Sequence, residues 1–266
     1  MLVLGACIAT ASVAQGRPED YCSRPIRAAL FEYGVLYRSG TQDGIDPKLL
    51  ETLAERTGCS IETSVMPRAR MWNEMRAGHL DVLTGAFPTP ERKTYSYMLP
   101  YLKSRNLVLL RKSGVPAPQS LADFLAGPGR LGVLRSGQYE KTYLDWMRQL
   151  REKGRLVEAV DAAEQMRFLE KGIVDSILSL PVVFPLYADA AWLEKEVLLQ
   201  DWAPKEEESV GTLMLSRQTF TPTQARNWGQ LLTAMAQDGT QYRIHRAFLP
   251  AKQARDLIYA GPRGLD

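Results

Sequence analysis

The stretch DVLTGAFPTPER, residues 81–92, decides how the rest of the chain is interpreted. It begins as an apolar run, typical of a buried strand, and then breaks into a polar turn with two prolines and a terminal Glu-Arg pair. Each proline fixes its own φ and restrains the residue before it, so the turn has little backbone freedom. We interpret the break as one wall of a ligand-binding cleft, with Arg92 held at its end.

Strand and helix patterns alternate on both sides of this stretch. The pattern predicts strands at 26–33, 60–66 and 80–84, and a helix that begins near Pro47. A second alternating block runs from 121 to 199, and a strand at 212–216 then leads into a helical tail. Such alternation is typical of an α/β fold with parallel strands joined by helices.

Two stretches have the composition of linkers, VPAPQS (115–120) and APKEEESVG (203–211). The chain is therefore expected to leave a first lobe, build a second and return, so that two crossings form a hinge beside a cleft. Lobe 1 is expected to span residues 15–112 and lobe 2 residues 113–205, and residues 206–266 are expected to return to lobe 1 and form the helical tail.

The first 14 residues carry no charge and are almost all small or apolar. They are too few to span a bilayer, which needs about 20 apolar residues. Ser12-Val13-Ala14 resembles a small-x-small cleavage site, so 1–14 is predicted to be a secretory signal peptide and the protein to be periplasmic. Two alternatives stay open: a lipoprotein box that would lipidate Cys7, and a buried N-terminal segment.

If Cys7 is removed with the signal peptide or lipidated, two cysteines remain in the exported protein, Cys22 and Cys59. Each lies just before a predicted strand. In an oxidising compartment two such cysteines are a candidate pair, and parallel neighbouring strands would bring their starting ends together. A disulfide is therefore predicted, with two free thiols as the alternative.

Composition argues for binding rather than chemistry. A hydrophobic content of 45% and a charged content of 24% are typical of an ordinary globular protein. The net charge is +3, and residues of both signs are scattered along the chain, so no basic patch for nucleic acid is indicated. His79 and His245 are too few for a histidine-based metal site, and no phosphate-binding loop, dinucleotide fingerprint or Cys-x-x-Cys motif occurs. No enzyme activity, cofactor or metal is expected.

Four segments resemble, in order, the bacterial extracellular solute-binding proteins of family 3. They are GIDPKLLETLAERTGC (44–59), RAGHLDVLTGAFPTPERKTYSYMLPYLKSRNLVLLRK (76–112), LGVLRSGQYE (131–140) and LEKGIVDSILSLPV (169–182). The resemblance covers roughly residues 25–245. It implies a two-lobed periplasmic binding protein fold of type II, hinge closure on a small solute, a monomer, and an ABC permease in the inner membrane as partner.

The resemblance also implies site residues in the first lobe. Arg92 would grip the carboxylate of the ligand, because a guanidinium offers a planar fork of donors. Thr84 and Gly85 would contribute a polar group and backbone amides, and Phe87 stands where many relatives have Ser or Thr. Alternatively, Arg92 caps the following segment or pairs with an acid such as Glu91.

Arg68, in MPRARMW, lies where relatives often have an aromatic residue that contacts the ligand. Two interpretations of Arg68 stay open, a cleft residue or a surface ion pair worth under ~1 kcal/mol. For Arg70 the surface ion pair is favoured, and Trp72 is expected in the helix core. Tyr33, at the end of the first strand, is a further ligand-binding candidate.

In the second lobe the family places a small polar run at a helix N-terminus, which attracts anions. The matching residues are Ser136, Gly137, Gln138 and Tyr139, and Ser179 follows on a later strand. The aspartate that holds the ligand's ammonium in amino-acid receptors is replaced by Leu180. Burying an ammonium without an acid costs several kcal/mol, unless Glu32 substitutes.

The expected function is therefore a periplasmic receptor that captures a small polar, carboxylate-bearing, amino-acid-like solute for an ABC uptake transporter. The alternatives are an enzyme or a sensory module built on the same scaffold.

Overall fold

The computed structural model describes residues 17–112, 116–135, 137–205, 208–259 and 261. The expected signal peptide at 1–14, with Cys7, lies outside these residues, and so does Ser136. None of the described helices has the length and apolar character needed to cross a membrane.

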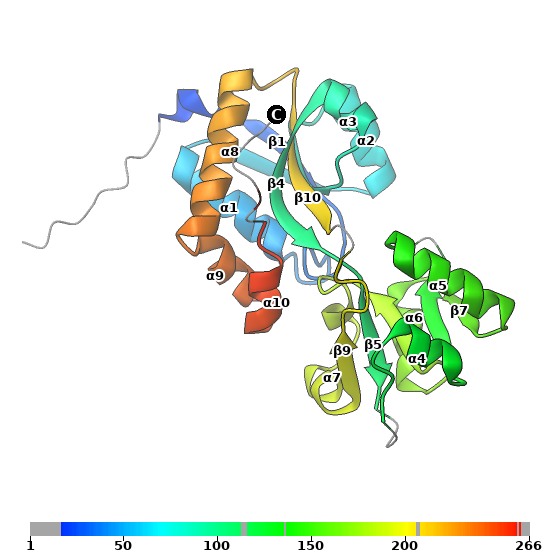
Figure 1. Cartoon of the computed structure of the whole chain (residues 1–266). Coiled ribbons are helices and arrows are strands. Elements are labelled where there is room, and N and C mark those ends of the chain that lie inside the picture. Colours follow the sequence, from blue (N-terminus) through cyan, green and yellow to red (C-terminus); the bar gives the residue numbers. More distant parts are fainter. Residues whose placement is uncertain (1–16, 113–115, 136, 206–207, 260, 262–266) are drawn as a thin grey trace, which may run out of the picture.

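Two five-stranded sheets form the centres of two lobes, as expected for the predicted α/β, two-lobed fold (Figure 1). The first sheet has the order β2-β1-β3-β10-β4, in which β1 runs parallel to β2 and β3 while β10 is antiparallel to its neighbours. Its strands are β1 (Ile26–Leu30), β2 (Ile61–Val65), β3 (Val82–Ala86), β4 (Ser96–Ser104) and β10 (Ser209–Ser216). The second sheet has the order β7-β6-β8-β5-β9. Its strands are β5 (Leu107–Arg111), β6 (Leu131–Leu134), β7 (Leu156–Ala159), β8 (Ser176–Ser179) and β9 (Val197–Gln200).

The chain crosses between the two sheets twice. The first crossing occupies Arg105 and Asn106, because β5 already pairs with β8 and β9 of the second sheet. The boundary expected at 112 therefore falls after β5, and VPAPQS belongs to a loop that leads to α4 (Leu121–Ala126). The second crossing lies between β9 and β10, in the region of the second expected linker.

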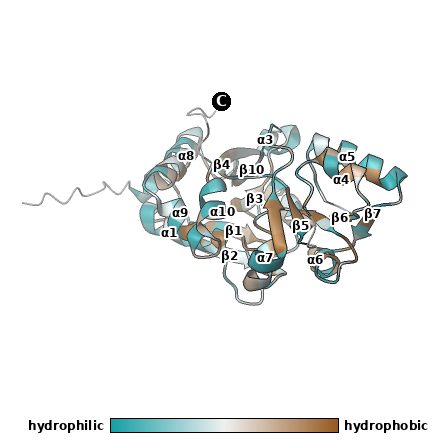
Figure 2. Ribbon diagram, turned by 60° about the horizontal axis from the view of Figure 1, so that its bottom comes forward, coloured by the Kyte–Doolittle hydropathy of each residue, from teal (hydrophilic) through white to brown (hydrophobic). Residues whose placement is uncertain are grey.

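Helices cover both faces of each sheet. In the first lobe α1 (Ile45–Thr57), α8 (Pro222–Gln237), α9 (Thr240–Arg246) and α10 (Ala251–Asp256) lie on one side of the sheet, and α2 (Arg68–Arg76) and α3 (Pro90–Tyr95) on the other (Figure 1). In the second lobe α4 and α5 (Lys141–Glu152) pack on one face, and α6 (Ala162–Glu170) and α7 (Ala190–Glu196) on the other. The hydrophobic strands between these helices, β5 among them, are visible in Figure 2.

Helix ends follow the residue types at their boundaries. Thr221 and Gln224 form a capping box at the start of α8, with Pro222 at the first helical position. Helix α1 ends at Gly58, whose left-handed backbone closes the helix.

A disulfide joins Cys22 to Cys59, with 6.2 Å between their Cα atoms. The two residues precede β1 and β2, which pair in parallel from Ile26 and Ile61 onward. The starting ends of these strands are adjacent, which is the arrangement on which the prediction of the bridge depended.

Asp81, the first residue of the opening stretch, anchors the start of β3. Its side chain is completely buried, and it accepts hydrogen bonds from Arg24 (2.8 Å), from the side chain and backbone N–H of Arg27, and from Thr219 Oγ1 (2.7 Å). Burial acts to raise its pKa, but the hydrogen bonds from Arg27, Thr219 and Arg24 together hold the pKa well below its usual range. These contacts connect β1, β3 and the turn after β10.

Candidate functional site

The candidate site lies at the carboxyl ends of β1, β2 and β3. These strands run in parallel, so the segments that follow them meet at one edge of the sheet. Phe31 follows β1, Arg68 begins α2 shortly after β2, and Phe87 follows β3. The side chains of all three meet, since the guanidinium carbon of Arg68 lies 5.0 Å from the centre of the Phe31 ring and 5.5 Å from that of Phe87.

Arg68 lies among aromatic rings and pairs with no acid in the described part of the chain. Its guanidinium carbon is also 5.7 Å from the centre of the Trp72 ring, and none of the ion pairs between described residues includes it. Burial lowers its pKa; nearby Tyr33 acts to raise it and the charge of Arg92 to lower it further. Arg70, in contrast, forms the expected exposed ion pair with Glu74 at 3.1 Å.

Arg92 occupies the turn that ends the opening stretch. Thr89 caps α3 by accepting a hydrogen bond from the N–H of Arg92 at 3.2 Å, and Pro90 takes the first helical position. The Arg92 side chain donates through Nη1 to the carbonyl of Phe87 at 2.6 Å, and its guanidinium carbon lies 3.9 Å from the centre of the Trp72 ring. The alternative pairing with Glu91 does not form, because Glu91 pairs with Arg76.

Arg68 and Arg92, the arginine pair, thus share one ring and lack an acidic partner among the described residues. Two like charges that are partly removed from water favour a negatively charged ligand. The rings of Phe31, Tyr33, Trp72 and Phe87 form an aromatic frame around the pair. Trp72 and Phe31 were not among the predicted site residues. Trp72 stands four residues after Arg68 on one helix, and this spacing is the signal that could have revealed the contact.

Thr84 and Gly85 face the interior of the first lobe. The N–H of Gly85 donates to the hydroxyl of Tyr101 at 3.0 Å, and that hydroxyl donates to Oδ1 of Asp46 at 2.6 Å. Burial raises the pKa of Asp46 to about 6, against the lowering effect of the Tyr101 hydroxyl. Gly85 is thus engaged through Tyr101 with a buried carboxyl group, whereas the Thr84 hydroxyl is buried and has no hydrogen-bond partner among the described residues.

The loop after β6 also uses its polar groups internally. The N–H of Gly137 donates to the carbonyl of Leu134 at 3.0 Å, and the Tyr139 hydroxyl accepts from the N–H of Leu134 at 2.8 Å. Helix α5 begins only at Lys141, so its free N-terminal amides lie beyond the expected run, while Gln138 is exposed. Burial raises the pKa of Tyr139 to about 12, against the lowering effect of the hydrogen bond with the N–H of Leu134.

The two lobes touch each other directly. The N–H of Val35 donates to the carbonyl of Val182 at 2.7 Å, and Gly34, with a φ of +54°, lies so close that a Cβ there would be 1.9 Å from the same oxygen. Leu180 packs against a hydrophobic cluster that joins the first lobe to Val182 and Val183, and Ser179 is buried beside it. We call the pairing of Val35 with Val182 the interlobe contact.

Two acids, Glu32 and Asp161, have partners other than a ligand. Glu32, the expected substitute for the missing aspartate, is exposed and accepts a hydrogen bond from the hydroxyl of Ser39. Asp161 caps the start of α6 by accepting from the N–H of Glu164 at 2.7 Å.

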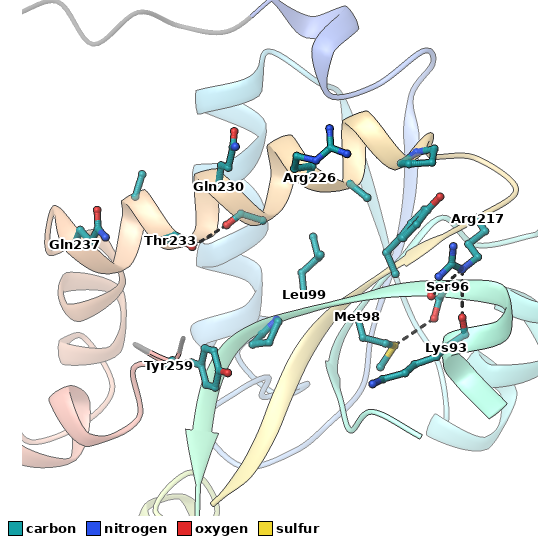
Figure 3. A pocket seen from close by; sticks show the side chains of 17 residues that line it. Lys93, Ser96, Met98, Leu99, Arg217, Arg226, Gln230, Thr233, Gln237 and Tyr259 are labelled. Carbon is teal, nitrogen blue, oxygen red and sulfur yellow. Dashed lines mark hydrogen bonds between the residues drawn. The ribbon is translucent and has the colours of Figure 1, made fainter. Parts of the chain in front are cut away.

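Cavities and histidines lie away from the predicted site residues. A cavity of about 780 Å³ lies between α8 and β4, where Arg217, Arg226 and Leu99 line it (Figure 3), and another of about 420 Å³ lies at the crossings.

His79 is exposed and hydrogen-bonded to Glu74, while His245 is buried. Within the described residues no cluster of three metal-ligating side chains occurs.

Comparison with known proteins gives one family. The model of the bacterial extracellular solute-binding proteins, family 3, matches residues 26–251. No curated protein sequence matches the chain.

Among solved structures, three similar ones are an ancestral cationic amino acid solute-binding protein, a polar amino acid ABC uptake transporter substrate-binding protein from Streptococcus thermophilus, and a histidine kinase sensor domain with similarity to periplasmic binding proteins. The first is 17% identical, with coverage of 85% of this chain and 96% of that chain and a TM-score of 0.66. The second is 16% identical, with coverage of 87% and 89% and a TM-score of 0.63. The third is 15% identical, with coverage of 87% and 97% and a TM-score of 0.58. At these identities the likeness shows the fold alone.

Proposed function

Because the chain belongs to the bacterial extracellular solute-binding proteins of family 3, we propose that it is a periplasmic receptor for a small, carboxylate-bearing solute. It captures an amino-acid-like solute between its lobes and presents it to the permease of an ABC uptake transporter. It acts as a monomer, because one chain supplies both walls of the cleft.

The arginine pair carries this proposal. Its two guanidinium groups are half-buried beside aromatic rings at the carboxyl ends of parallel strands, without an acid in the described part of the chain to neutralise them. A carboxylate matches the planar fork of a guanidinium and restores the balance of charge. The proposed ligand-binding residues are Tyr33, Arg68, Phe87 and Arg92 of the first lobe, and Ser136, Gly137, Gln138, Tyr139 and Ser179 of the second.

Thr84 and Gly85 contribute in a different way. Gly85 positions the turn by holding β3 to Tyr101, whose hydroxyl also holds Asp46, and a ligand would reach this amide only if its hydrogen bond broke. Thr84 contributes a buried hydroxyl without a hydrogen-bond partner among the described residues.

A thermal-shift screen of amino acids, organic acids and amines tests the receptor function. A genuine ligand raises the melting temperature in a saturable way and stabilises the fold by about 2.7 kcal/mol at 100 times its Kd. The ligand should be recovered unchanged after long incubation with the protein. Turnover of the bound compound, or a complete absence of binding across the screen, would contradict the proposal.

A sensory module is the second candidate, favoured by the likeness to a histidine kinase sensor domain. The two functions differ in the partner of the liganded protein. A receptor stimulates uptake when added back to cells that lack it, whereas a sensory module leaves uptake unchanged and alters the activity of a signalling protein. We favour binding over catalysis because Asp46, a carboxyl group whose pKa is raised, is buried and hydrogen-bonded to Tyr101.

A further inference from the structure

The arrangement of charge in the cleft indicates the class of the solute, an inference that rests on the proposed function. Arg68 and Arg92 both lie close to one side chain, since their guanidinium carbons are 5.7 and 3.9 Å from the centre of the same Trp72 ring. One small molecule can therefore touch both guanidinium groups.

Closure of the lobes removes water from both guanidinium groups, and a buried charge without a partner is strongly unfavourable. A solute with one carboxylate neutralises one of them and leaves the other. A zwitterionic amino acid has no net charge and leaves the excess of two positive charges unchanged. A solute with two negative charges balances the pair.

Among the described residues, the positions considered for an ammonium group hold either an apolar side chain or an acid that already has a partner. Leu180 packs against the hydrophobic cluster that includes Val182, a member of the interlobe contact. Glu32 is exposed and bonded to Ser39, and Asp161 caps α6.

We propose that the solute is a small dicarboxylate without an amino group, with one carboxylate on Arg92 and the other on Arg68. Its hydrocarbon part lies against the aromatic frame, where Phe87 presents an apolar surface. Arg68 is thus the residue that determines the specificity for a second carboxylate.

Calorimetric titration of the protein purified from the periplasm of the expression host tests the inference. The compounds are succinate and glutarate, butyrate as the monocarboxylate, aspartate and glutamate as the amino-bearing analogues, and inorganic phosphate. We expect one of the two dicarboxylates to bind at least about tenfold more tightly than butyrate, aspartate, glutamate and phosphate.

Substitutions at Arg68 assign the second carboxylate. Arg68→Gln should weaken dicarboxylate binding by about 30-fold or more and butyrate binding by less than about threefold. Arg70→Gln is the matched control on the same helix, since Arg70 is exposed and paired with Glu74, and it should change neither affinity. Melting curves check that each variant folds. If Arg68→Gln does not fold, Arg68→Lys, which keeps the charge and loses the fork, should give a smaller loss confined to the dicarboxylate.

The outcomes separate this inference from the receptor function. If an amino acid or phosphate binds more tightly than both dicarboxylates, or if Arg68→Gln weakens butyrate and dicarboxylate equally, the inference is overturned while the receptor function stands. If no compound of this panel or of the wider thermal-shift screen binds, both are overturned.

Discussion

The guanidinium group of Arg92 lies on the face of Trp72, 3.9 Å from the ring centre, while its Nη1 donates to the carbonyl of Phe87. Neither partner carries a charge. The side chain is therefore held in place before a solute arrives, and its positive charge remains available. Preorganisation of this kind reduces the entropy lost on binding.

Arg92→Ala should weaken binding of the solute by about 2–4 kcal/mol, because a charged, desolvated hydrogen-bond partner is lost. The protein without solute should stay folded. Calorimetric titration and a melting curve of the variant measure both quantities. Arg76→Ala is the control, since Arg76 is an exposed neighbour paired with Glu91, and it should leave the affinity unchanged. An unchanged affinity in Arg92→Ala, together with a large fall in melting temperature, would assign Arg92 a purely structural role.

Asp81→Asn should lower the free energy of unfolding by about 2–4 kcal/mol at pH 7, because two arginines lose their shared buried partner. The folded-state pKa of Asp81 is lowered, so its contribution is present above the unfolded pKa of about 3.9 and is lost as the pH falls below that value. Urea unfolding of variant and wild type at pH 7 and pH 3 measures this, and the difference should shrink at pH 3. Asp256→Asn, which breaks an exposed pair with Lys252, should cost less than about 1 kcal/mol.

Cys22 and Cys59 should be unreactive toward thiol reagents in the denatured, unreduced protein and should both react after reduction. Replacing both by Ser should cost about 2–4 kcal/mol of stability, because the bridge limits the freedom of the unfolded chain between them. Reduction of the wild type is the control and should give the same loss as the double variant. Two reactive thiols in periplasmic protein before reduction would contradict the prediction.

His245 should make the fold less stable in mild acid. Burial lowers its pKa to about 4, opposed by the hydrogen bond with the carbonyl of Ala254. The unfolded state therefore binds a proton near pH 6.5 that the folded state does not, and stability is lost as the pH falls from about 6.5 to 4, by an amount on the order of 3 kcal/mol.

The comparison of wild type with His245→Gln isolates this effect. Asp46 acts in the opposite direction, since its raised pKa of about 6 gives a contribution that is present below the unfolded pKa and lost as the pH rises through 6. Asp46 is the same in both proteins, so it cancels in the difference. Chemical unfolding at pH 7.5, 6 and 4.5 should show the wild type losing its advantage over the variant as the pH falls, and a difference independent of pH would contradict the assignment.

The sequence predicted the features that depend on local pattern. The alternation of strand and helix, the parallel start of β1 and β2 and the pairing of Cys22 with Cys59 all follow from residues close to each element. The first crossing did not follow, because β5 joins the second sheet through partners 66 to 92 residues later in the chain. Only two residues separate β5 from β4.

The candidate site shows the same limit. The turn that holds Arg92 could be predicted, since Thr89, Pro90 and the residues that follow have the composition of a helix start. The hydrogen bond of Gly85 with Tyr101 could not, because it depends on Asp46, which lies far away in the sequence and reaches the site only in the folded chain.

Substitution of Gly34 offers a way to change the interlobe contact and, through it, the apparent Kd for the solute. A single methyl group at this position would overlap the carbonyl oxygen of Val182, and Val35 could not keep its hydrogen bond. A side chain there would change how the two lobes lie against each other. If one arrangement of the lobes binds the solute, the apparent Kd is the intrinsic Kd divided by the fraction of molecules in that arrangement. The glycine therefore lets the working concentration range of the protein, as a reagent for detecting its solute, be tuned from outside the binding site.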